Sequence, residues 1–194
     1  MARPQECQEY RYNAVPKNLA VLDGPNATFK LATAQLPALQ DDQLLVKTLY
    51  LSNDPAQRGW LNPRVDPERL YAKPVQLNTR MHAYGVCEVI ESKHTKFKKG
   101  DHVTANPGWG EFAVVPARDC TPAPPLPRGI SETHYLGAVG NTGLTAYYGL
   151  VEVARAKPTD IVVVSGAAGA TGSMAIQVAR HLVGCRKVIG IAGG

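Results

Sequence analysis

Residues 160–184 read DIVVVSGAAGATGSMAIQVARHLVG, and this stretch decides the fold of the chain. It opens with a continuous β-branched run at 160–165, turns through small residues at 166–172, and continues as a helical pattern to Gly184. A second apolar run, KVIGIAG, follows. Continuous rather than alternating apolar strands are typical of a parallel sheet that is covered on both faces. The order strand, turn, helix, strand therefore predicts one right-handed βαβ unit.

The glycine-rich turn is the first candidate site. Small residues between a strand and a helix let the backbone turn sharply and approach a pyrophosphate closely. Backbone N–H groups at the helix start, with the positive end of its dipole, then bind phosphate oxygens. A tight turn in an unrelated α/β protein is the alternative. The residues expected to bind a dinucleotide here are Gly166, Ala168, Gly169, Ala170, Thr171 and Gly172.

The preceding sequence changes character at a proline-rich stretch, TPAPPLPRG at 121–129, which we expect to continue neither strand nor helix. Before it, short β-branched and aromatic runs separated by turn signals predict an all-β, barrel-like half. After it, Ser131 can cap a short helix, and the run 142–154 has the spacing of an amphipathic helix. The predicted strands of the first half are residues 43–52, 84–92, 102–105 and 111–116.

Composition excludes several classes of protein. The chain has 194 residues, 44% of them apolar and 19% charged, which is typical of a folded globular protein and not of a disordered one. The formal net charge of +5 is small for a nucleic-acid coat. Neither a membrane-spanning run nor a secretory signal is present. The four cysteines lie far apart without a C-x-x-C pair, so we expect a reducing, cytoplasmic setting.

Several motifs occur in one order along most of the chain: YLSNDPAQR at 50–58, GWGEF at 108–112, GLTAYYGL at 143–150 and VSGAAGATGS at 164–173. Together they resemble the medium-chain dehydrogenase/reductase superfamily. Within it they are most similar to the zinc-free branch of leukotriene B4 dehydrogenase, prostaglandin reductase and 2-alkenal double-bond reductases. The resemblance covers residues from about Leu44 to Gly194.

The resemblance implies an α/β plus β fold: a GroES-like β-barrel on the substrate side, residues 1–130, and the first βαβ part of a Rossmann domain, residues 131–194. It also implies that NADPH gives a hydride to the β-carbon of an α,β-unsaturated aldehyde or ketone. The implied partners are a small enone, alkenal or quinone and, for a full-length protein, a second copy in a homodimer. Nucleic acid and membrane are not implied.

Zinc is not expected. Aligned on Asp54 and Gly85, the positions at which zinc alcohol dehydrogenases carry a ligand cysteine and histidine fall at Leu51 and Met81. Neither side chain offers the thiolate or imidazole that zinc prefers. The five histidines also lack H-x-x-x-H spacing, so we expect them to be surface or hydrogen-bonded residues.

Three further residues are candidates by their place in the motifs. Tyr50 is the candidate catalytic phenol, able to hydrogen-bond a developing enolate oxygen, with a half-buried strand tyrosine as the alternative. Arg58 either reaches cofactor phosphate or forms a structural ion pair that orients Asp54. Thr145 resembles the family's cofactor-facing threonine, with capping or back-bonding within its helix as the alternative.

The chain departs from the family's pattern at two places. Ala56-Gln57 replaces a Tyr-Met pair and Asn141-Thr142 replaces a Met-containing pair, and we expect both to lie on surfaces near cofactor or substrate. The basic run from Lys93 to Lys99 carries one aromatic residue, Phe97, and is interpreted as a solvated hairpin that does not bind nucleic acid.

Two alternatives to an enone reductase stay open. The first is a zinc-free NADPH:quinone oxidoreductase of the same superfamily. The second is a non-catalytic piece that only binds or dimerises, because a Rossmann sheet has about six strands and two are found here. The chain ends at Gly194, where the residue that discriminates NAD from NADP would come, so NADP rests on the resemblance alone.

Overall fold

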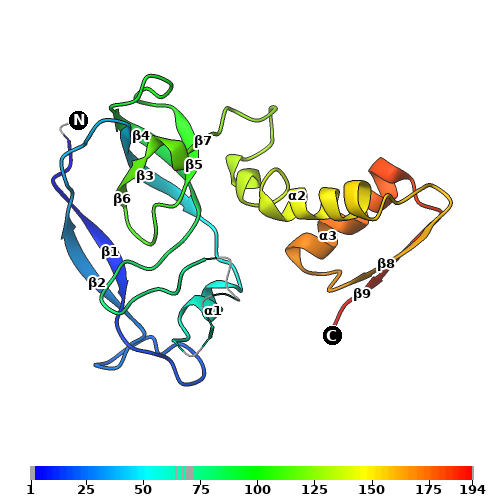
Figure 1. Ribbon diagram of the computed structural model, residues 1–194, viewed down its shortest axis with the longest axis horizontal. Helices are drawn as coiled ribbons and strands as arrows, with labels where there is room; N and C mark the ends of the chain where they lie inside the picture. The colour runs from blue at the N-terminus through cyan, green and yellow to red at the C-terminus, as the bar shows by residue number, and fades with distance from the viewer. Residues whose placement is uncertain (1–2, 64, 67, 69–71, 194) are drawn as a thin grey trace. The chain divides into compact units, whose positions relative to one another are not determined.

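The computed structural model describes residues 3–63, 65–66, 68 and 72–193. They form two compact units, Met1–Pro125 and Leu126–Gly194, here called the N-terminal unit and the C-terminal unit. The N-terminal unit is built almost entirely of strands, and the C-terminal unit combines helices with a parallel strand pair (Figure 1).

The N-terminal unit contains an antiparallel five-stranded sheet in the order β6-β3-β4-β5-β7 and a separate two-stranded ribbon, β1-β2. Isolated bridges, Glu9 to Gly110 and Arg11 to Arg80, connect the ribbon with the segments that precede β6 and β4. Among the described residues of this unit, the strands form two separate hydrogen-bonded sheets that do not close into one barrel. The strands are β1 (Glu6–Tyr12), β2 (Phe29–Gln35), β3 (Gln43–Leu51), β4 (Gly85–Ser92), β5 (His102–Ala105), β6 (Phe112–Pro116) and β7 (Thr121–Pro122).

The sequence predicted β3 to β6 to within a residue at each end and missed β1, β2 and β7. In β1 the inward positions Cys7 and Glu9 alternate with exposed ones, but a carboxylate in the inward row hides the period-2 apolar pattern. The expectation of no strand at 121–129 was wrong for Thr121 and Pro122, which pair with β5 at an edge of the sheet. An edge strand tolerates proline because its outer side needs no donor.

The core of the five-stranded sheet is a cluster of fully buried aliphatic residues and two cysteines, Cys87 and Cys120. Burial, with Cys120 nearby, raises the pKa of the Cys87 thiol to about 12. Burial and the neighbouring Asp119 raise the pKa of Cys120 to about 11. Cys7 is buried as well, whereas Cys185 of the C-terminal unit is half-buried. The thiols of Cys7, Cys87 and Cys120 are therefore shielded from solvent. Those of Cys87 and Cys120 are also held in their protonated form.

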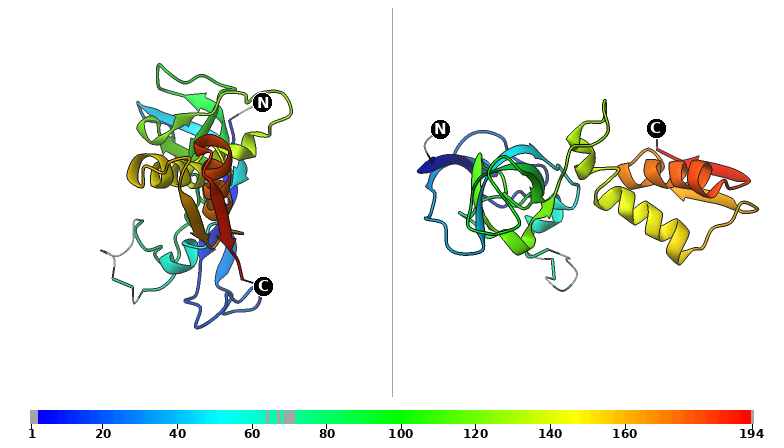
Figure 2. Two further views of the ribbon diagram at one scale, coloured as in Figure 1. Left: turned by 90° about the vertical axis from the view of Figure 1, so that its right-hand side faces the viewer. Right: turned by 90° about the horizontal axis from the view of Figure 1, so that it is seen from above.

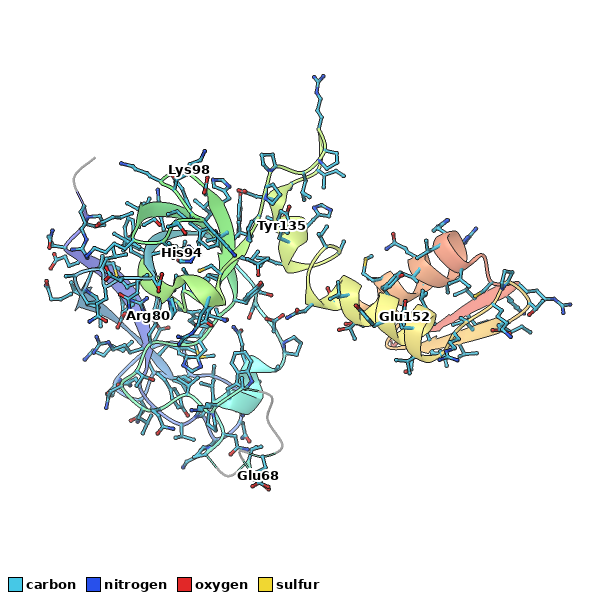
Figure 3. The ribbon with its side chains drawn as sticks, turned by 45° about the horizontal axis from the view of Figure 1, so that its top comes forward. Glu68, Arg80, His94, Lys98, Tyr135 and Glu152 are labelled. Carbon is cyan, nitrogen blue, oxygen red and sulfur yellow. The ribbon has the colours of Figure 1, made fainter. Side chains whose placement is uncertain are left out.

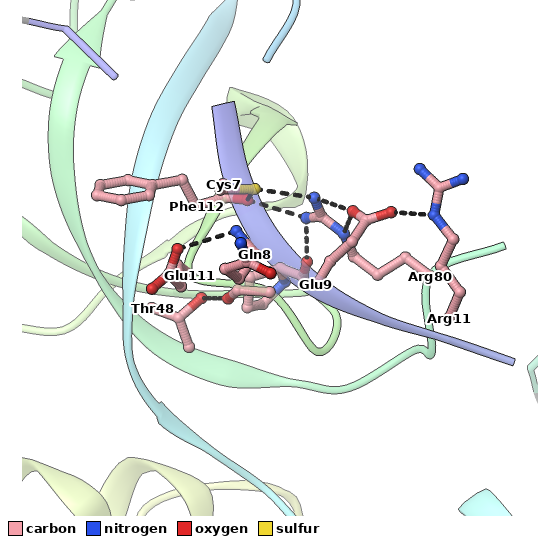
Figure 4. A network of polar contacts seen from close by, with 10 residues as sticks. Cys7, Gln8, Glu9, Arg11, Thr48, Arg80, Glu111 and Phe112 are labelled. Atoms are coloured by element: carbon pink, nitrogen blue, oxygen red, sulfur yellow. Dashed lines mark hydrogen bonds and ion pairs between the residues drawn. The ribbon is translucent and has the colours of Figure 1, made fainter. Parts of the chain in front are cut away.

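A polar network anchors the β1-β2 ribbon (Figure 4). The Arg80 guanidinium donates to the Glu9 carboxylate and, at 3.0 Å each, to the carbonyl oxygens of Pro107 and Phe112. Arg11 donates to the second Glu9 oxygen at 2.6 Å. Glu9 is only 5% exposed, so its charge depends on these two partners for compensation. This network holds β1 against the segment that leads into β6.

The C-terminal unit contains the predicted βαβ unit. Strands β8 (Ile161–Ser165) and β9 (Lys187–Ile191) pair in parallel, and α3 (Ala170–Gln177) connects them and lies along them (Figure 2). Helix α3 continues as a π-helical turn, Val178–Val183, and α2 (Asn141–Tyr147) packs beside it and continues at Tyr148–Val153. The short helix Glu132–Leu136 begins at the Ser131 cap, as predicted.

Apolar side chains stay exposed on two elements of this unit. Helix α2 has the predicted amphipathic spacing, yet Leu144 and Tyr148 are 55% and 54% exposed, while Gly143 and Ala146 are buried. The continuous apolar run of β8 is typical of a strand covered on both faces, yet Val163 is 58% exposed. In both cases apolar character indicates a face able to pack but not which neighbour covers it.

Two short helices complete the described elements of the N-terminal unit. Helix α1 (Gln57–Trp60) follows β3, and a 3-10 turn (Ala117–Asp119) follows β6. Among the described residues, no helix combines the length and the apolar character that crossing a bilayer requires.

We expect Arg80→Met to lower the free energy of unfolding of the N-terminal unit by about 3–5 kcal/mol, because it leaves the buried Glu9 carboxylate undercompensated. The control is Arg11→Met, which removes a partner that is 40% exposed and is expected to cost under about 1 kcal/mol. Urea unfolding followed by tryptophan fluorescence reports this unit, since Trp60 and Trp109 both belong to it. Equal, small losses for the two variants would contradict the role given to Arg80.

We expect a neutral alkylating reagent at pH 8 to modify Cys185 rapidly in the native chain, and the three buried cysteines only after unfolding. The raised pKa of Cys87 also sets the sign of a pH effect. Its contribution to stability is complete below its ordinary value of 9.0 and is lost as the pH rises toward about 12. Peptide mapping by mass spectrometry reads the labelling, and rapid native labelling of Cys87 would contradict the packing described.

Candidate functional site

The glycine-rich turn of the C-terminal unit forms a tight loop between β8 and α3. Gly166 has φ +60°, a left-handed conformation that glycine adopts without strain. The N–H of Ala167 donates to Ile191 of β9 at 3.0 Å, and that of Gly169 donates back to the Gly166 carbonyl at 2.9 Å. These two bonds fix the turn against the end of the strand pair.

Close backbone contact makes Gly172 necessary. A Cβ added there would lie 2.2 Å from the Gly166 carbonyl oxygen, well inside contact distance, and the obstacle is backbone that cannot rotate away. The close neighbour of this glycine is therefore the turn's own backbone, at Gly166 and Ala167. The close approach to the strand pair occurs at Gly190, where a Cβ would lie 2.8 Å from Ala167 Cβ.

The start of α3 offers donors for an anion. The helix begins at Ala170 after Gly169, and its first intrahelical bond runs from Ser173 N–H to the Gly169 carbonyl at 2.9 Å. The N–H groups of Ala170, Thr171 and Gly172 therefore have no acceptor within the helix. Small side chains leave the approach to these donors open. The turn thus fits the pyrophosphate of a dinucleotide, with donors and dipole directed at the anion.

Thr145 lies on α2 in the same unit as the turn. Its side chain is exposed, and its hydroxyl makes no hydrogen bond within the described part of the chain. The hydroxyl that bonds locally belongs to Thr142, which donates to the Gly137 carbonyl at 2.9 Å. This bond ties the start of α2 to the preceding turn and is not a cap, because α2 has no side-chain N-cap. The Thr145 hydroxyl remains available for a ligand.

Tyr50 lies near the end of β3, in the N-terminal unit, with its side chain 43% exposed. An irregularity in the β3-β4 pairing between Thr48 and Tyr50 ends the regular alternation there. The Tyr50 backbone is held close to β4, because a Cβ on Gly85 would lie 2.6 Å from the Tyr50 carbonyl oxygen. The result is a fixed backbone carrying a phenol that is accessible to solvent and ligands.

Arg58 lies on α1, and its guanidinium donates to the Asn18 carbonyl of a preceding loop. Within the described residues it forms no ion pair with Asp54, whose carboxylate instead accepts from the Ser52 hydroxyl at 2.9 Å. In this structure Arg58 therefore tethers a loop. The ion pair that would orient Asp54 is not formed among the described residues, and a contact with cofactor phosphate stays a prediction.

Gln57 is one of the two residues that depart from the family's Tyr-Met pair, and it was expected on a surface. That expectation was wrong, because Gln57 is 5% exposed. Its amide donates to the carbonyls of Ser52 and His82, at 3.3 and 3.2 Å, and accepts from Asp54 N–H at 3.3 Å. Gln57 thus fastens the loop after Tyr50 to the segment around His82.

A hollow of about 480 Å³ lies beside that segment, and its lining includes Trp60, Met81, His82 and Asn106. Desolvation by burial lowers the pKa of the His82 imidazole, so neutral imidazole predominates near pH 7. This hollow could not be predicted from the sequence, because its lining comes from separate segments without a common spacing. Met81, at a zinc-ligand position of the metal-dependent relatives, is 1% exposed. No group of three potential metal ligands occurs among the described residues.

The candidate residues are distributed over two units. Tyr50, Arg58 and the hollow beside His82 belong to the N-terminal unit, whereas Thr145 and the glycine-rich turn belong to the C-terminal unit. A comparison with protein families matches residues 23–123 to the model described as the N-terminal domain of oxidoreductase. The chain belongs to this oxidoreductase family. It lies in the medium-chain dehydrogenase/reductase superfamily, with the GroES-like and partial Rossmann fold that the motifs implied.

Relatives that are named reductases agree with this family. The chain is 37% identical to prostaglandin reductase 1 of Mus musculus over 169 residues, and this aligned region covers 87% of this chain and 47% of the relative. It is 36% identical over 172 residues to a 2-alkenal reductase (NADP(+)-dependent) of Nicotiana tabacum, covering 87% and 46%. The crystal structure of CurA from Vibrio vulnificus in complex with NADPH matches with a TM-score of 0.79 and 33% identity, over 96% of this chain and 52% of that one. The chain spans about half the length of these relatives.

We expect Gly85→Ala to lower the free energy of unfolding of the N-terminal unit by about 1–3 kcal/mol, because the new methyl group meets the Tyr50 carbonyl. Gly149→Ala is the control. No atom lies within 4 Å of its added Cβ, and alanine stabilises a helix more than glycine does, so no loss of stability is expected. Urea unfolding is followed by tryptophan fluorescence for Gly85→Ala and by far-UV circular dichroism for both variants, because both tryptophans belong to the N-terminal unit. If Gly85→Ala were as stable as the parent chain, the close β3-β4 approach at Tyr50 would be refuted.

Proposed function

We propose that this chain forms the substrate-side and pyrophosphate-binding parts of an NADPH-dependent reductase that reduces the C=C bond of α,β-unsaturated aldehydes and ketones. The observation that carries the proposal is the turn between β8 and α3, with its open N–H groups and its required close contact at Gly172. The named reductases among the relatives support the same reaction class.

In this proposal the turn binds the cofactor. The N–H groups of Ala170, Thr171 and Gly172 donate to pyrophosphate oxygens, and the dipole of α3 favours their negative charge. Gly166, Ala168 and Gly169 contribute by lacking bulk, which keeps the donors accessible. The Thr145 hydroxyl is a further donor for the cofactor. Arg58 is retained as a candidate phosphate contact only if it releases the Asn18 carbonyl.

Tyr50 is the proposed catalytic residue. NADPH, when bound, supplies the hydride that the β-carbon of the substrate accepts, and negative charge then develops on the carbonyl oxygen. A phenol O–H directed at that oxygen stabilises the charge as it forms, which lowers the barrier more than it strengthens substrate binding. The rigid backbone that Gly85 provides for Tyr50 preorganises this donor.

The cofactor part of the proposal is tested by NADPH titration, followed by nicotinamide fluorescence. We expect Gly172→Ala to weaken NADPH binding at least about tenfold, because opening the turn to admit the methyl displaces the donors of α3. Gly149→Ala is the control and should bind as the parent chain does. Unchanged affinity in Gly172→Ala, or no NADPH binding by the parent chain, would overturn the assignment of the turn.

The chemical part is tested by NADPH oxidation with 4-hydroxynonenal and other enones as acceptors. The 194-residue chain alone is expected to bind NADPH weakly and to turn over no enone. In a protein that joins this chain to a complete Rossmann domain, we expect turnover that chelators do not inhibit, and a fall in kcat of about a hundredfold in Tyr50→Phe with little change in KM. Tyr10→Phe, an exposed strand tyrosine of the same unit, is the control. Preferential oxidation by quinones would favour the quinone oxidoreductase, and NADPH binding without turnover would favour a non-catalytic binding role; either would overturn the enone assignment.

A further inference from the structure

A second hollow, of about 510 Å³, lies in the N-terminal unit at the opposite end of β3 from Tyr50. Its lining includes Asp42, His94, Lys96, Phe97, Arg118 and Cys120; we call it the basic hollow. Asp42 directly precedes β3, and about eight extended residues separate it from Tyr50, or about 25 Å. The reaction proposed above uses none of these residues.

The floor of the basic hollow is part of the folded core. Phe97 and Cys120 are 8% and 9% exposed and belong to the core cluster of the five-stranded sheet. The Ala117 N–H donates to the Asp42 carbonyl at 2.8 Å, and the Cys120 N–H donates to the Ala117 carbonyl at 3.1 Å. These bonds fix the turn after β6 against the start of β3. The hollow is therefore built by three chain segments and does not depend on a ligand to form.

The rim carries hydrogen-bond donors and positive charge. The His94 Nδ1 accepts from Lys96 N–H at 3.1 Å, so a neutral His94 ring carries its own hydrogen on Nε2, as a donor. Within the described residues Lys96 forms no ion pair, and Arg118 approaches only Asp119, at 3.9 Å, with its side chain 85% exposed. An exposed contact of that length contributes little, so both cations are available to a ligand.

Charge in the segments that form the hollow favours an anion. Lysines 93, 96, 98 and 99 and Arg118 outnumber the carboxylates of Asp41, Asp42, Asp101 and Asp119. Of these carboxylates, Asp101 accepts from the Lys98 N–H at 2.9 Å and Asp42 alone lines the hollow. Figure 3 labels His94 and Lys98 of this hairpin among the side chains of the unit.

We propose that the basic hollow binds a small organic anion, with its carboxylate or sulfonate group at Lys96 and Arg118 and its apolar body against Phe97 and Cys120. A cationic rim over an apolar, preformed floor matches a ligand with one charged end and one apolar end. Inorganic phosphate would leave the apolar floor uncovered. A nucleic-acid strand presents successive bases, and a single hollow cannot accommodate them. The site is independent of the pyrophosphate turn and of Tyr50.

The test uses 2-naphthoate as the probe, with its neutral analogue 2-naphthamide and inorganic phosphate for comparison. Binding to the 194-residue chain is followed by shifts of the backbone amide NMR resonances of Phe97, Ala117 and Cys120 and by calorimetry. We expect 2-naphthoate to shift these resonances and to bind at least about tenfold more tightly than 2-naphthamide or phosphate, with an affinity that falls as salt increases.

Substitutions separate the site from a general effect of charge. Lys96→Ala and Arg118→Ala should each weaken 2-naphthoate binding about tenfold. Lys98→Ala, which removes the same charge from the same hairpin but lies outside the lining, should change it less than about twofold. Asp42→Asn should strengthen binding, because it removes the one carboxylate of the lining, and asparagine tolerates the positive φ of 60° at this position.

Several results would overturn the proposal. These are no shift of the three amides, equal affinity for 2-naphthamide, equal affinity for phosphate, and equal losses in Lys96→Ala and Lys98→Ala. Because Lys96 and Arg118 are exposed, their variants are expected to fold, and circular dichroism verifies this. The gain expected in Asp42→Asn provides a readout that loss of folding cannot imitate.

Discussion

Arg80 brings a guanidinium into contact with the carboxylate of one strand and the carbonyl oxygens of two later segments, and the N-terminal unit is organised around this contact. Gly108 and Gly110 lie so close to the Arg80 side chain that an added Cβ would approach it to 2.7 and 3.0 Å. Both glycines of the GWGEF motif therefore leave room for the Arg80 side chain. A motif that carries the family resemblance is thus explained by packing.

The same contact connects packing to the candidate site. Arg80 precedes Met81 and His82, which line the hollow, and the backbone N–H of Met81 donates to the Tyr10 carbonyl of β1 at 3.0 Å. If the ribbon detached, the segment 80–83 would lose its neighbours on one side. Gln57 fastens the other side of that segment through the His82 carbonyl. The hollow is thus held from two directions by buried polar groups, whose energetic cost requires that all partners remain in place.

The fold could be predicted where the signal is local. The turn at 166–172, its strand and its helix follow from adjacent residues, and four strands of the first half follow from short β-branched and aromatic runs bounded by turn signals. Prediction failed where a distant partner decides the outcome. Glu9 lies in the inward row of β1 only because Arg80 compensates it from another segment. Likewise, the sequence alone could not show that α2 buries Gly143 and Ala146 and not its larger apolar residues.

The candidate site shows the same difference between features made by adjacent residues and features decided by distant partners. The pyrophosphate turn was readable because one continuous stretch makes all of it, and the backbone contact of Gly172 gives the motif its physical reason. The part of the candidate site in the N-terminal unit could be predicted only from the family resemblance around Tyr50. Its departure at Gln57 was expected to reshape a surface, yet the side chain is buried and makes three hydrogen bonds to backbone. A methionine there could make none of them, so the loop after Tyr50 is positioned in this chain by polar contacts.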